Sequence, residues 1–382
     1  MTPPGPELRQ RAATLRPQLL ERQAEAERLR RLPEATIRDF HEAGILRTIQ
    51  PAVFGGFETD FLDQVDMTFE IARACGSSGW VYAVLSAHAA MIANFPERAQ
   101  TEIWGRDPRA LAASSLFAMG RYRRVDGGYL VGGHWRYASG CDYCARLVAG
   151  AEAAAAAADQ PPARMRFLLP VAEMEILDDW QVMGLAGTGS KSLRADELFV
   201  PEWLAITDAE FLDNSGPGRR LHDHSHLYRM SRAAHPGPLS LAMAGVGIAQ
   251  HAVDWVGEHL DAMGVGRTGA VEREVIRHDL LESAAEADAA RLMLRRTVGE
   301  VERAAKARRE PVPRALTELV ARDRHFATRL ALRATERLFH AAGSRALFAD
   351  NELQRCFRDL HAVASRLTRL GGMRGGPAGG EV

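Results

Sequence analysis

A histidine and two serines are the side chains of this sequence best suited to proton transfer. His88 lies in a run of apolar residues at helical spacing, so it shares one helix face with Val81, Val84, Leu85 and Met91. A histidine on such a face is most often a core residue, although a neutral imidazole also serves as a general base. Ser139 ends a strand-like run in an Ala-Ser-Gly turn, and Ser114 precedes another such run. Each hydroxyl either binds a ligand or bonds to nearby backbone, and the residues alone leave both interpretations open.

Two further clusters contain residue types that bind metals or carry redox chemistry. Residues 222–226 include three histidines and an aspartate, but alternating ligands in a linker rarely form a closed metal site. We predict no metal there and expect a solvated loop, or one that folds over the active site. Cys141 and Cys144 form a C-x-x-C pair without a second ligand pair or a thioredoxin-like context, so we interpret them as apolar strand residues.

Length and charge limit the classes of protein to consider. The 382 residues exceed the roughly 250–300 at which one hydrophobic core stops growing, so two or three packed lobes are expected. The formal net charge of -1 gives no overall attraction to nucleic acid or to an acidic membrane. No apolar run approaches the ~20 residues that span a bilayer, and the N-terminus lacks the apolar core of a secretory signal. We expect a soluble cytoplasmic protein that binds neither nucleic acid nor membrane.

The first hundred residues have the pattern of helices. They are predicted over residues 7–31, 33–44, 61–71 and 79–95. Pro33 suits the first turn of the second helix and Gly44 its end. Ser77 and Ser78 are placed to cap the fourth helix, which would carry His88.

Between about residues 110 and 201 the pattern changes to that of β-strands. A hairpin-type turn at 126–128 precedes one strand with Tyr129, Val131 and Trp135 on one face. A second strand alternates over residues 164–169, and Leu198, Phe199 and Val200 end the region. The alanine-rich run 153–158, followed by two prolines, is expected to be an exposed loop.

Helical periodicity returns after about residue 226. Four long helices are predicted over residues 238–262, 270–308, 313–341 and 351–370. The order therefore predicts a mostly helical α+β protein with an inserted strand region. The expected parts are an N-terminal helical domain (1–108), a central β domain (109–210), a C-terminal helical bundle (211–370) and a disordered glycine-rich tail (371–382).

Several short motifs occur in register along this order. They are Phe40-His41-Glu42-Ala43-Gly44-Ile45, Phe54-Gly55-Gly56, Gly76-Ser77-Ser78-Gly79-Trp80, the run Gly133–Cys141, Trp180 with the run Met183–Ser190, and the run Asn351–Asp359. Together they resemble the oxygenase components of two-component flavin-dependent monooxygenases, which include hydroxylases of p-hydroxyphenylacetate, secosteroids, polyketides and indoles. The resemblance covers about residues 20–370.

The resemblance implies an acyl-CoA dehydrogenase fold: N-terminal helices, a central β-barrel or sandwich, and a C-terminal four-helix bundle, usually in a homotetramer. It implies that the chain binds reduced flavin, FADH2 or FMNH2, and uses O2 to hydroxylate a small aromatic substrate through a C4a-hydroperoxyflavin. The sequence has no nicotinamide-binding fingerprint. A separate NAD(P)H:flavin reductase is therefore expected to supply the flavin by diffusion.

The resemblance also assigns roles to three residues. The serine that matches Ser139 lies beside flavin N5, where an uncharged acceptor for the N5 proton prolongs the oxygen adduct. The histidine that matches His88 binds the substrate. With a phenol, it would offset part of the about 4 kcal/mol needed to form the phenolate near pH 7; with an indole, it would only orient the ring. Ser114 is expected to face the same pocket and to hydrogen-bond the substrate.

The implied flavin-side residues are Trp135, Ser139, Trp180, Gly187, Thr188, Ser190, Arg267 and His361. Glycines in the run 184–190 let backbone amides approach flavin oxygens. Arg267 matches an arginine that reaches a flavin phosphate, often across a subunit interface. Two positions depart from the family pattern, because Ala186 stands where arginine is frequent and Arg366 where a second histidine is frequent.

Three other functions stay open as alternatives. An acyl-CoA dehydrogenase needs a carboxylate base soon after the Arg358-Asp359 pair, and residues 360–364 contain none. N- or S-oxygenation on the same fold would differ only in the substrate cavity. A helical scaffold that has lost flavin is the third alternative, suggested by Ala186 and Arg366.

Overall fold

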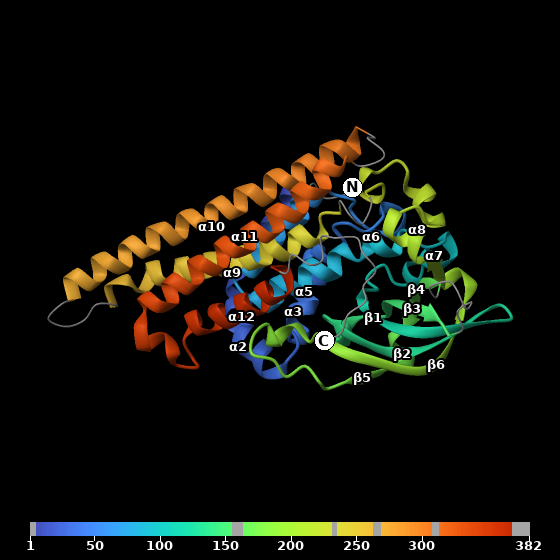
Figure 1. Ribbon diagram of the computed structural model, residues 1–382, viewed down its shortest axis with the longest axis horizontal. Coiled ribbons are helices and arrows are strands. Elements are labelled where there is room, and N and C mark those ends of the chain that lie inside the picture. The colour runs from blue at the N-terminus through green and yellow to red at the C-terminus, as the bar shows by residue number, and fades with distance from the viewer. Residues whose placement is uncertain (1–4, 155–162, 231–234, 263–268, 308–312, 369–382) are drawn as a thin grey trace.

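The computed structural model has the expected order of helices, strands and long helices (Figure 1). It describes residues 5–154, 163–230, 235–262, 269–307 and 313–368, without the side chains of 117–119, 262, 269, 270 and 272. In Figure 1 the long C-terminal helices gather at one end and the sheet at the other, with N-terminal helices between them. The alanine-rich run from 155 onward and the tail 371–382, on which predictions were made, lie outside the described residues.

Seven helices form the N-terminal region. They are α1 (Gly5–Thr14), α2 (Arg16–Leu29), α3 (Glu34–Ala43), α4 (Phe61–Ala72), α5 (Gly76–Ala87), α6 (Ala89–Ile92) and α7 (Glu97–Trp104). The helix predicted over 7–31 is two helices, interrupted at Leu15. The second predicted helix ends at Gly44 as expected, because that residue adopts a left-handed φ of 77°.

The helix that carries His88 differs from its prediction. It begins at Gly76, with Cys75 in the capping position, so the predicted capping role of Ser77 and Ser78 is wrong and both lie in its first turn. It is also interrupted at His88, between α5 and α6. The turn tightens there, since the His88 carbonyl accepts a hydrogen bond from the Met91 amide at 2.9 Å.

The strands form one mixed sheet in the order β5-β6-β2-β1-β3-β4-β7. Their bounds are β1 (Ala112–Val125), β2 (Gly128–Ala138), β3 (Arg146–Ala153), β4 (Arg164–Pro170), β5 (Glu175–Leu177), β6 (Lys191–Pro201) and β7 (Ala205–Thr207). Three strand spacings, about 14 Å in a flat sheet, separate β2 from β4. The rings of Tyr129 on β2 and Phe167 on β4 nevertheless lie 5.4 Å apart. The expected barrel or sandwich is therefore one strongly curled sheet around a shared core.

Four long helices follow a short helix, α8 (Asp208–Asp213). They are α9 (Gly237–His259), α10 (Gly269–Lys306), α11 (Arg314–Ala341) and α12 (Glu352–Leu367), and each end lies within three residues of its prediction. Glycines let α9 approach its neighbours closely: a Cβ at Gly247 would lie 2.7 Å from the Ala72 methyl on α4. Among the described residues, no helix is long and apolar enough to cross a membrane.

The C-x-x-C pair does not lie on a strand, so that prediction is wrong. Cys141 belongs to a 3₁₀ turn after β2, and Cys144 follows that turn. Both thiols are buried and free. Burial raises the pKa of the Cys141 thiol to about 12, which keeps it protonated and unreactive near neutral pH.

Candidate active site

Helix α5 positions the serine that follows β2. The Trp80 indole N–H donates to Ser139 Oγ at 3.2 Å, and both side chains are buried. On the same helix, Val81 and Leu85 pack against Gly140, where a Cβ would lie 3.2 and 3.1 Å from their side chains. Gly140 also has a φ of +69°, so the turn after Ser139 needs glycine for two reasons. The Ala-Ser-Gly sequence thus fixes where the Ser139 hydroxyl lies.

Three hydroxyls form a hydrogen-bonded chain from this serine. Ser139 Oγ lies 2.6 Å from Ser190 Oγ, which lies 2.8 Å from Thr188 Oγ1. Thr188 in turn donates to the Leu185 carbonyl at 2.8 Å. All three hydroxyls are buried. The structure therefore brings together three residues that were predicted separately to contact the cofactor.

The direction of this chain follows from the last acceptor. A carbonyl only accepts, so the Thr188 proton is committed to Leu185 and Thr188 accepts from Ser190. Ser190 then accepts from Ser139, and Ser139 accepts from Trp80. Since a hydroxyl has one proton and two lone pairs, Ser139 keeps one lone pair and no proton for a ligand. Toward a ligand, Ser139 is therefore a hydrogen-bond acceptor only.

The loop that carries Thr188 and Ser190 has a strained backbone. Leu185 adopts a φ of +54°, which is rare for a side chain of its kind, and Gly189 adopts +53°. The Leu185 amide donates to Asp359 Oδ1 on α12 at 2.6 Å. Gly184 lies against α12 so closely that a Cβ would be 2.1 Å from the Arg358 carbonyl. Contacts with α12 thus hold the loop in this conformation.

His88 and Ser114 form a second polar group at the other end of α5. His88 Nδ1 lies 2.7 Å from the Ala112 carbonyl on β1, and His88 Nε2 lies 3.0 Å from Ser114 Oγ. Since the carbonyl only accepts, Nδ1 carries the proton of the neutral ring and Nε2 accepts from Ser114. The imidazole is 5% exposed. Trp80 and His88 are eight residues apart, so about 12 Å of helix separates the two groups.

An apolar and partly charged surface borders the hydroxyl chain. The ring of Tyr137, which is 58% exposed, packs edge-on against Trp180 at 6.3 Å between centroids. The Trp180 indole donates to the Leu185 carbonyl at 3.3 Å. Beside them is an open depression of about 610 Å³, lined by residues 27, 28, 30, 181–183 and 186. Within it, Arg30 Nη1 is buried and has no hydrogen-bond partner among the described residues.

Comparison with known proteins identifies the family that has this fold. The chain matches the model of the acyl-CoA dehydrogenase N-terminal domain over residues 7–107 and that of the C-terminal domain over residues 239–367. It is 33% identical to HsaA, the oxygenase subunit of a flavin-dependent monooxygenase from Mycobacterium tuberculosis, over 91% of this chain and 88% of the relative. The chain belongs to the oxygenase subunits of flavin-dependent monooxygenases.

Two further proteins support the assignment of this chain to the oxygenase subunits of flavin-dependent monooxygenases. The oxygenase component of an FADH2-dependent resorcinol hydroxylase from Rhizobium sp. is 33% identical, over 90% of this chain and 86% of the relative. The crystal structure of 3-HSA hydroxylase from Rhodococcus sp. RHA1 has a TM-score of 0.89 at 31% identity, and covers 96% of this chain and 94% of its own. The predicted acyl-CoA dehydrogenase fold and the predicted flavin dependence are therefore confirmed.

The surface around residues 180–190 of this oxygenase fits a flavin. A flat apolar ring system would cover the exposed side chains of Tyr137 and Met183, which otherwise face water. The buried, unpartnered Arg30 Nη1 offers a donor that polar groups of such a cofactor could satisfy. Ser139 offers an acceptor, and the loop offers backbone amides.

Two predicted cofactor residues, Trp135 and His361, have other partners and are not brought to this group. Trp135 is 0% exposed and donates to the Gly150 carbonyl at 3.0 Å, so it is a core residue of the curled sheet. His361 packs against Phe357 at 4.2 Å between ring centroids, and its Nε2 lies 3.3 Å from Glu336 on α11. Arg267 lies outside the described residues.

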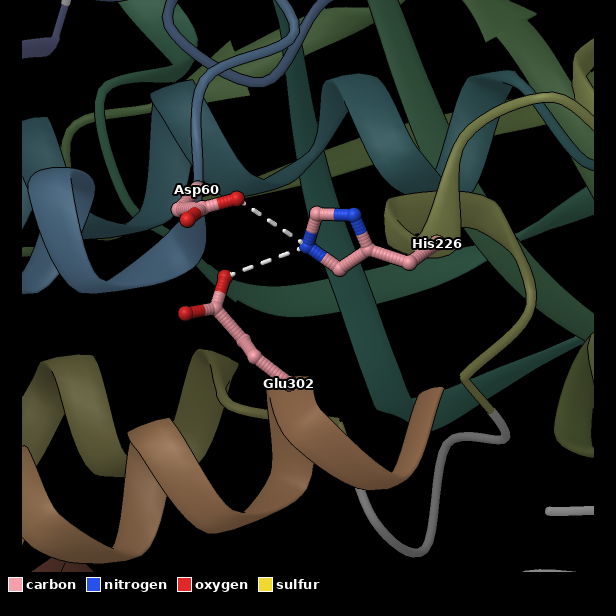
Figure 2. Close-up of side chains that lie close together, drawn as sticks. All are labelled: Asp60, His226 and Glu302. Atoms are coloured by element: carbon pink, nitrogen blue, oxygen red, sulfur yellow. Dashed lines mark hydrogen bonds and ion pairs between the residues drawn. The ribbon is translucent and has the colours of Figure 1, made fainter. Parts of the chain in front are cut away.

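The histidine-rich segment 222–226 was expected to be a solvated loop or one that folds over the active site, and it is only partly solvated. His222 is buried and lies 2.7 Å from Gln100 Oε1, and burial lowers its pKa to about 4. Figure 2 shows His226 Nε2 between Asp60 and Glu302, 3.3 Å from an oxygen of each.

These carboxylates already have other donors in the oxygenase. Lys306 binds Asp60 at 2.8 Å, and the Phe61 amide donates to Glu302 at 2.5 Å. Ligand-type atoms of Asp60, His226 and Glu302 lie within 4.8 Å of one another. With these donors in place, we interpret the cluster as an ion-pair network that ties the segment to α10 and to the start of α4.

Sequence reasoning missed Trp80, Leu185 and Asp359 as members of the site. Trp80 and Asp359 belong to motifs that carried the resemblance, but neither was given a role. A glycine-rich run indicates a tight backbone, and it does not indicate which residue holds that backbone. Only the fold shows that α12 supplies the anchor.

Proposed function

We propose that this oxygenase hydroxylates a small aromatic molecule of the phenol type, using O2 and reduced flavin from a separate reductase. The relatives named for resorcinol and p-hydroxyphenylacetate, both phenols, support this substrate class. The observation that carries the proposal is the hydrogen bond between Ser114 on β1 and His88, which ends the helix whose Trp80 donates to the hydroxyl chain. Oxygenation of a phenol requires a base that accepts the phenol proton, here the His88–Ser114 pair. It also requires a group that leaves a proton on the flavin, here Ser139.

Reduced flavin, when bound, supplies the activation of O2. Tyr137, Trp180 and Ser139 would hold it, together with Thr188, Ser190 and the backbone amides of the loop. Relatives include an enzyme named for FADH2, and this supports either FADH2 or FMNH2 as the cofactor, with FADH2 preferred.

The oxygenase would work as a homotetramer. Helices α10 and α11 support this, because they carry exposed apolar side chains that subunit contacts would cover, including Leu281, Leu292 and Phe326.

Ser139 would retain a proton at flavin N5. The one-way chain leaves Ser139 an acceptor only, so it favours a ligand atom that carries hydrogen over one that does not. The hydroxyl does this without charge, and so does not withdraw the proton. Release of hydrogen peroxide instead of product is the expected consequence when this hydrogen bond is lost.

His88 and Ser114 would remove a proton from the substrate hydroxyl. As the phenol O–H bond breaks, its proton passes to Ser114 Oγ, while the Ser114 proton passes to His88 Nε2. The products of this step are a phenolate and an imidazolium whose Nδ1–H donates to Ala112. At pH 7 a phenol with a pKa near 10 needs about 4 kcal/mol to ionise, and the imidazole offsets part of it.

The test is oxygen incorporation by the whole chain. The protein is mixed with FMN or FAD that has been reduced anaerobically, with a panel of phenols, and then with ¹⁸O2. We expect one labelled oxygen atom in the ring of at least one phenol, by mass spectrometry. Stoichiometric peroxide with every phenol, or labelled sulfoxide or N-oxide from thioether or amine substrates instead, would overturn the proposal.

A further inference from the structure

A buried carboxylate on α12 lies behind the loop of the hydroxyl chain. Asp359 is 6% exposed, and its Oδ1 accepts the Leu185 amide at 2.6 Å. Its Oδ2 faces the first turn of α5, where a Cβ on Gly76 would lie 2.9 Å away. Asp359 thus joins three segments that meet at the site: α12, the 184–190 loop and the helix that carries Trp80 and His88.

The peptide groups of Leu185 are the point at which these contacts converge. The amide donates to Asp359, while the carbonyl accepts from the Thr188 hydroxyl and from the Trp180 indole. The left-handed backbone of Leu185 aims the two groups in these directions. A residue held in such a conformation needs surrounding contacts that outweigh its strain. Among the described residues, Asp359 provides the one hydrogen bond to the Leu185 amide.

We propose that Asp359 is a positioning residue of the oxygenation reaction: by holding the Leu185 amide, it fixes the end of the chain that makes Ser139 a hydrogen-bond acceptor. This inference rests on the proposed role of Ser139 beside the flavin. Asp359 does not touch the reacting atoms. It acts through Leu185, Thr188 and Ser190.

The groups around Asp359 determine when it is charged. Arg355 and Arg358 flank it on α12, and both are turned to Glu27 on α2, at 3.1 and 2.5 Å. Arg358 also donates to the Met183 carbonyl. The thiols of Cys75, before α5, and Cys356, on α12, are buried nearby and protonated at neutral pH. No cation therefore pairs directly with Asp359 among the described side chains.

This environment makes the anchor sensitive to pH. Burial raises the pKa of Asp359 to about 6, although the Leu185 amide acts in the opposite direction. Above pH 6 the carboxylate is ionised and its hydrogen bond to the amide is charge-assisted. Below pH 6 the acid is protonated and that bond weakens. Peroxide release should therefore increase as the pH falls through about 6.

The first test measures the loop itself, without flavin or substrate. Amide hydrogen exchange is compared between wild type, Asp359→Leu and Asp359→Asn, with Glu352→Gln as a matched control. Glu352 is another carboxylate on α12, bonded to His251 at 2.5 Å and not to the loop. We expect roughly tenfold faster exchange at Leu185 in Asp359→Leu and wild-type exchange there in the control. Unchanged exchange in Asp359→Leu would overturn the positioning role whatever the enzyme's function.

The second test measures coupling. Hydrogen peroxide per reduced flavin is measured in single turnovers with a phenol substrate from pH 5 to 8. Wild type should show an inflection near pH 6 that Asp359→Asn lacks, because the near-isosteric amide folds and does not titrate. A purely structural role would lower stability and leave the inflection unchanged, and that result would overturn the proposal. Failure of wild type to oxygenate any phenol would instead contradict the proposed function, with the exchange result still valid.

Discussion

The two ends of α5 present opposite kinds of proton chemistry. At the Trp80 end, three uncharged hydroxyls donate hydrogen bonds in one direction, ending at a carbonyl, so Ser139 can only accept from a ligand. At the His88 end, the ring has a fixed Nδ1–H and a basic Nε2 that bonds Ser114. The hydroxyl chain therefore helps a bound ligand to keep a proton, whereas the His88–Ser114 pair can remove a proton from a ligand. One helix holds them about 12 Å apart.

The two ends also differ in what holds them. The serine end depends on a strained loop that α12 stabilises, whereas β1 supplies a hydrogen-bond partner to each nitrogen of the histidine ring. Changes at the two ends should therefore separate kinetically. The histidine end should affect hydroxylation, and the serine end should affect how much oxygen is lost as peroxide.

The largest effect is expected from His88→Ala. Loss of the proton acceptor should lower the rate of phenol hydroxylation about a hundredfold or more. The rate of flavin oxidation should change little. Rapid-quench measurement of product alongside stopped-flow absorbance of flavin separates the two. His224→Ala, at an exposed histidine, is the control. An equal loss in both rates would argue against a role on the substrate side.

A smaller effect is expected from Ser139→Ala. Loss of one hydrogen bond to the cofactor, worth about 1 kcal/mol, should shift the ratio of peroxide to product about fivefold. Peroxide and product are quantified after a single turnover with limiting reduced flavin. Ser115→Ala is the control, because Ser115 is a buried serine of β1 whose hydroxyl donates to the Arg136 carbonyl and not to the hydroxyl chain. Unchanged coupling in Ser139→Ala would remove the assignment.

The smallest functional effect is expected from Trp80→Phe. The substitution removes the donor to Ser139 but leaves the remaining hydroxyls and the direction of their chain in place. Stability should fall by about 1 kcal/mol, while coupling stays near that of wild type. Thermal unfolding and the peroxide assay measure the two. If Trp80→Phe uncouples the enzyme as strongly as Ser139→Ala does, then the hydrogen bonds among the three hydroxyls are not what makes Ser139 an acceptor toward the ligand.

The sequence predicted the order of elements and most of the long helices because their periodicity is strong. The ends of α9 to α12 lie close to their predictions. Local errors arose where tertiary contacts decide the outcome. The interruption at His88 coincides with its contacts to β1, and Cys141 and Cys144 lie in a buried turn that a two-residue spacing does not distinguish from a strand.

The site itself was only partly predictable. Ser139, Thr188 and Ser190 were assigned separately from the resemblance, and their hydrogen-bonded chain required the fold. The resemblance implied that Trp135 contacts the cofactor, but strand alternation turns its ring into the sheet core. Asp359 could not be recognised, since its partner Leu185 is 174 residues away in sequence.

The most direct test of the account is a single-turnover reaction of the protein with reduced flavin and oxygen. The chain is titrated anaerobically with reduced FMN and reduced FAD and then mixed with O2, while absorbance is followed with and without a phenol. We predict an absorbance transient, distinct from reduced and oxidised flavin, that persists longer with protein than in free solution and decays to hydroxylated product with the phenol. Oxidation at the rate of free flavin without a transient, or tight binding of oxidised FAD with turnover of acyl thioesters, would contradict it.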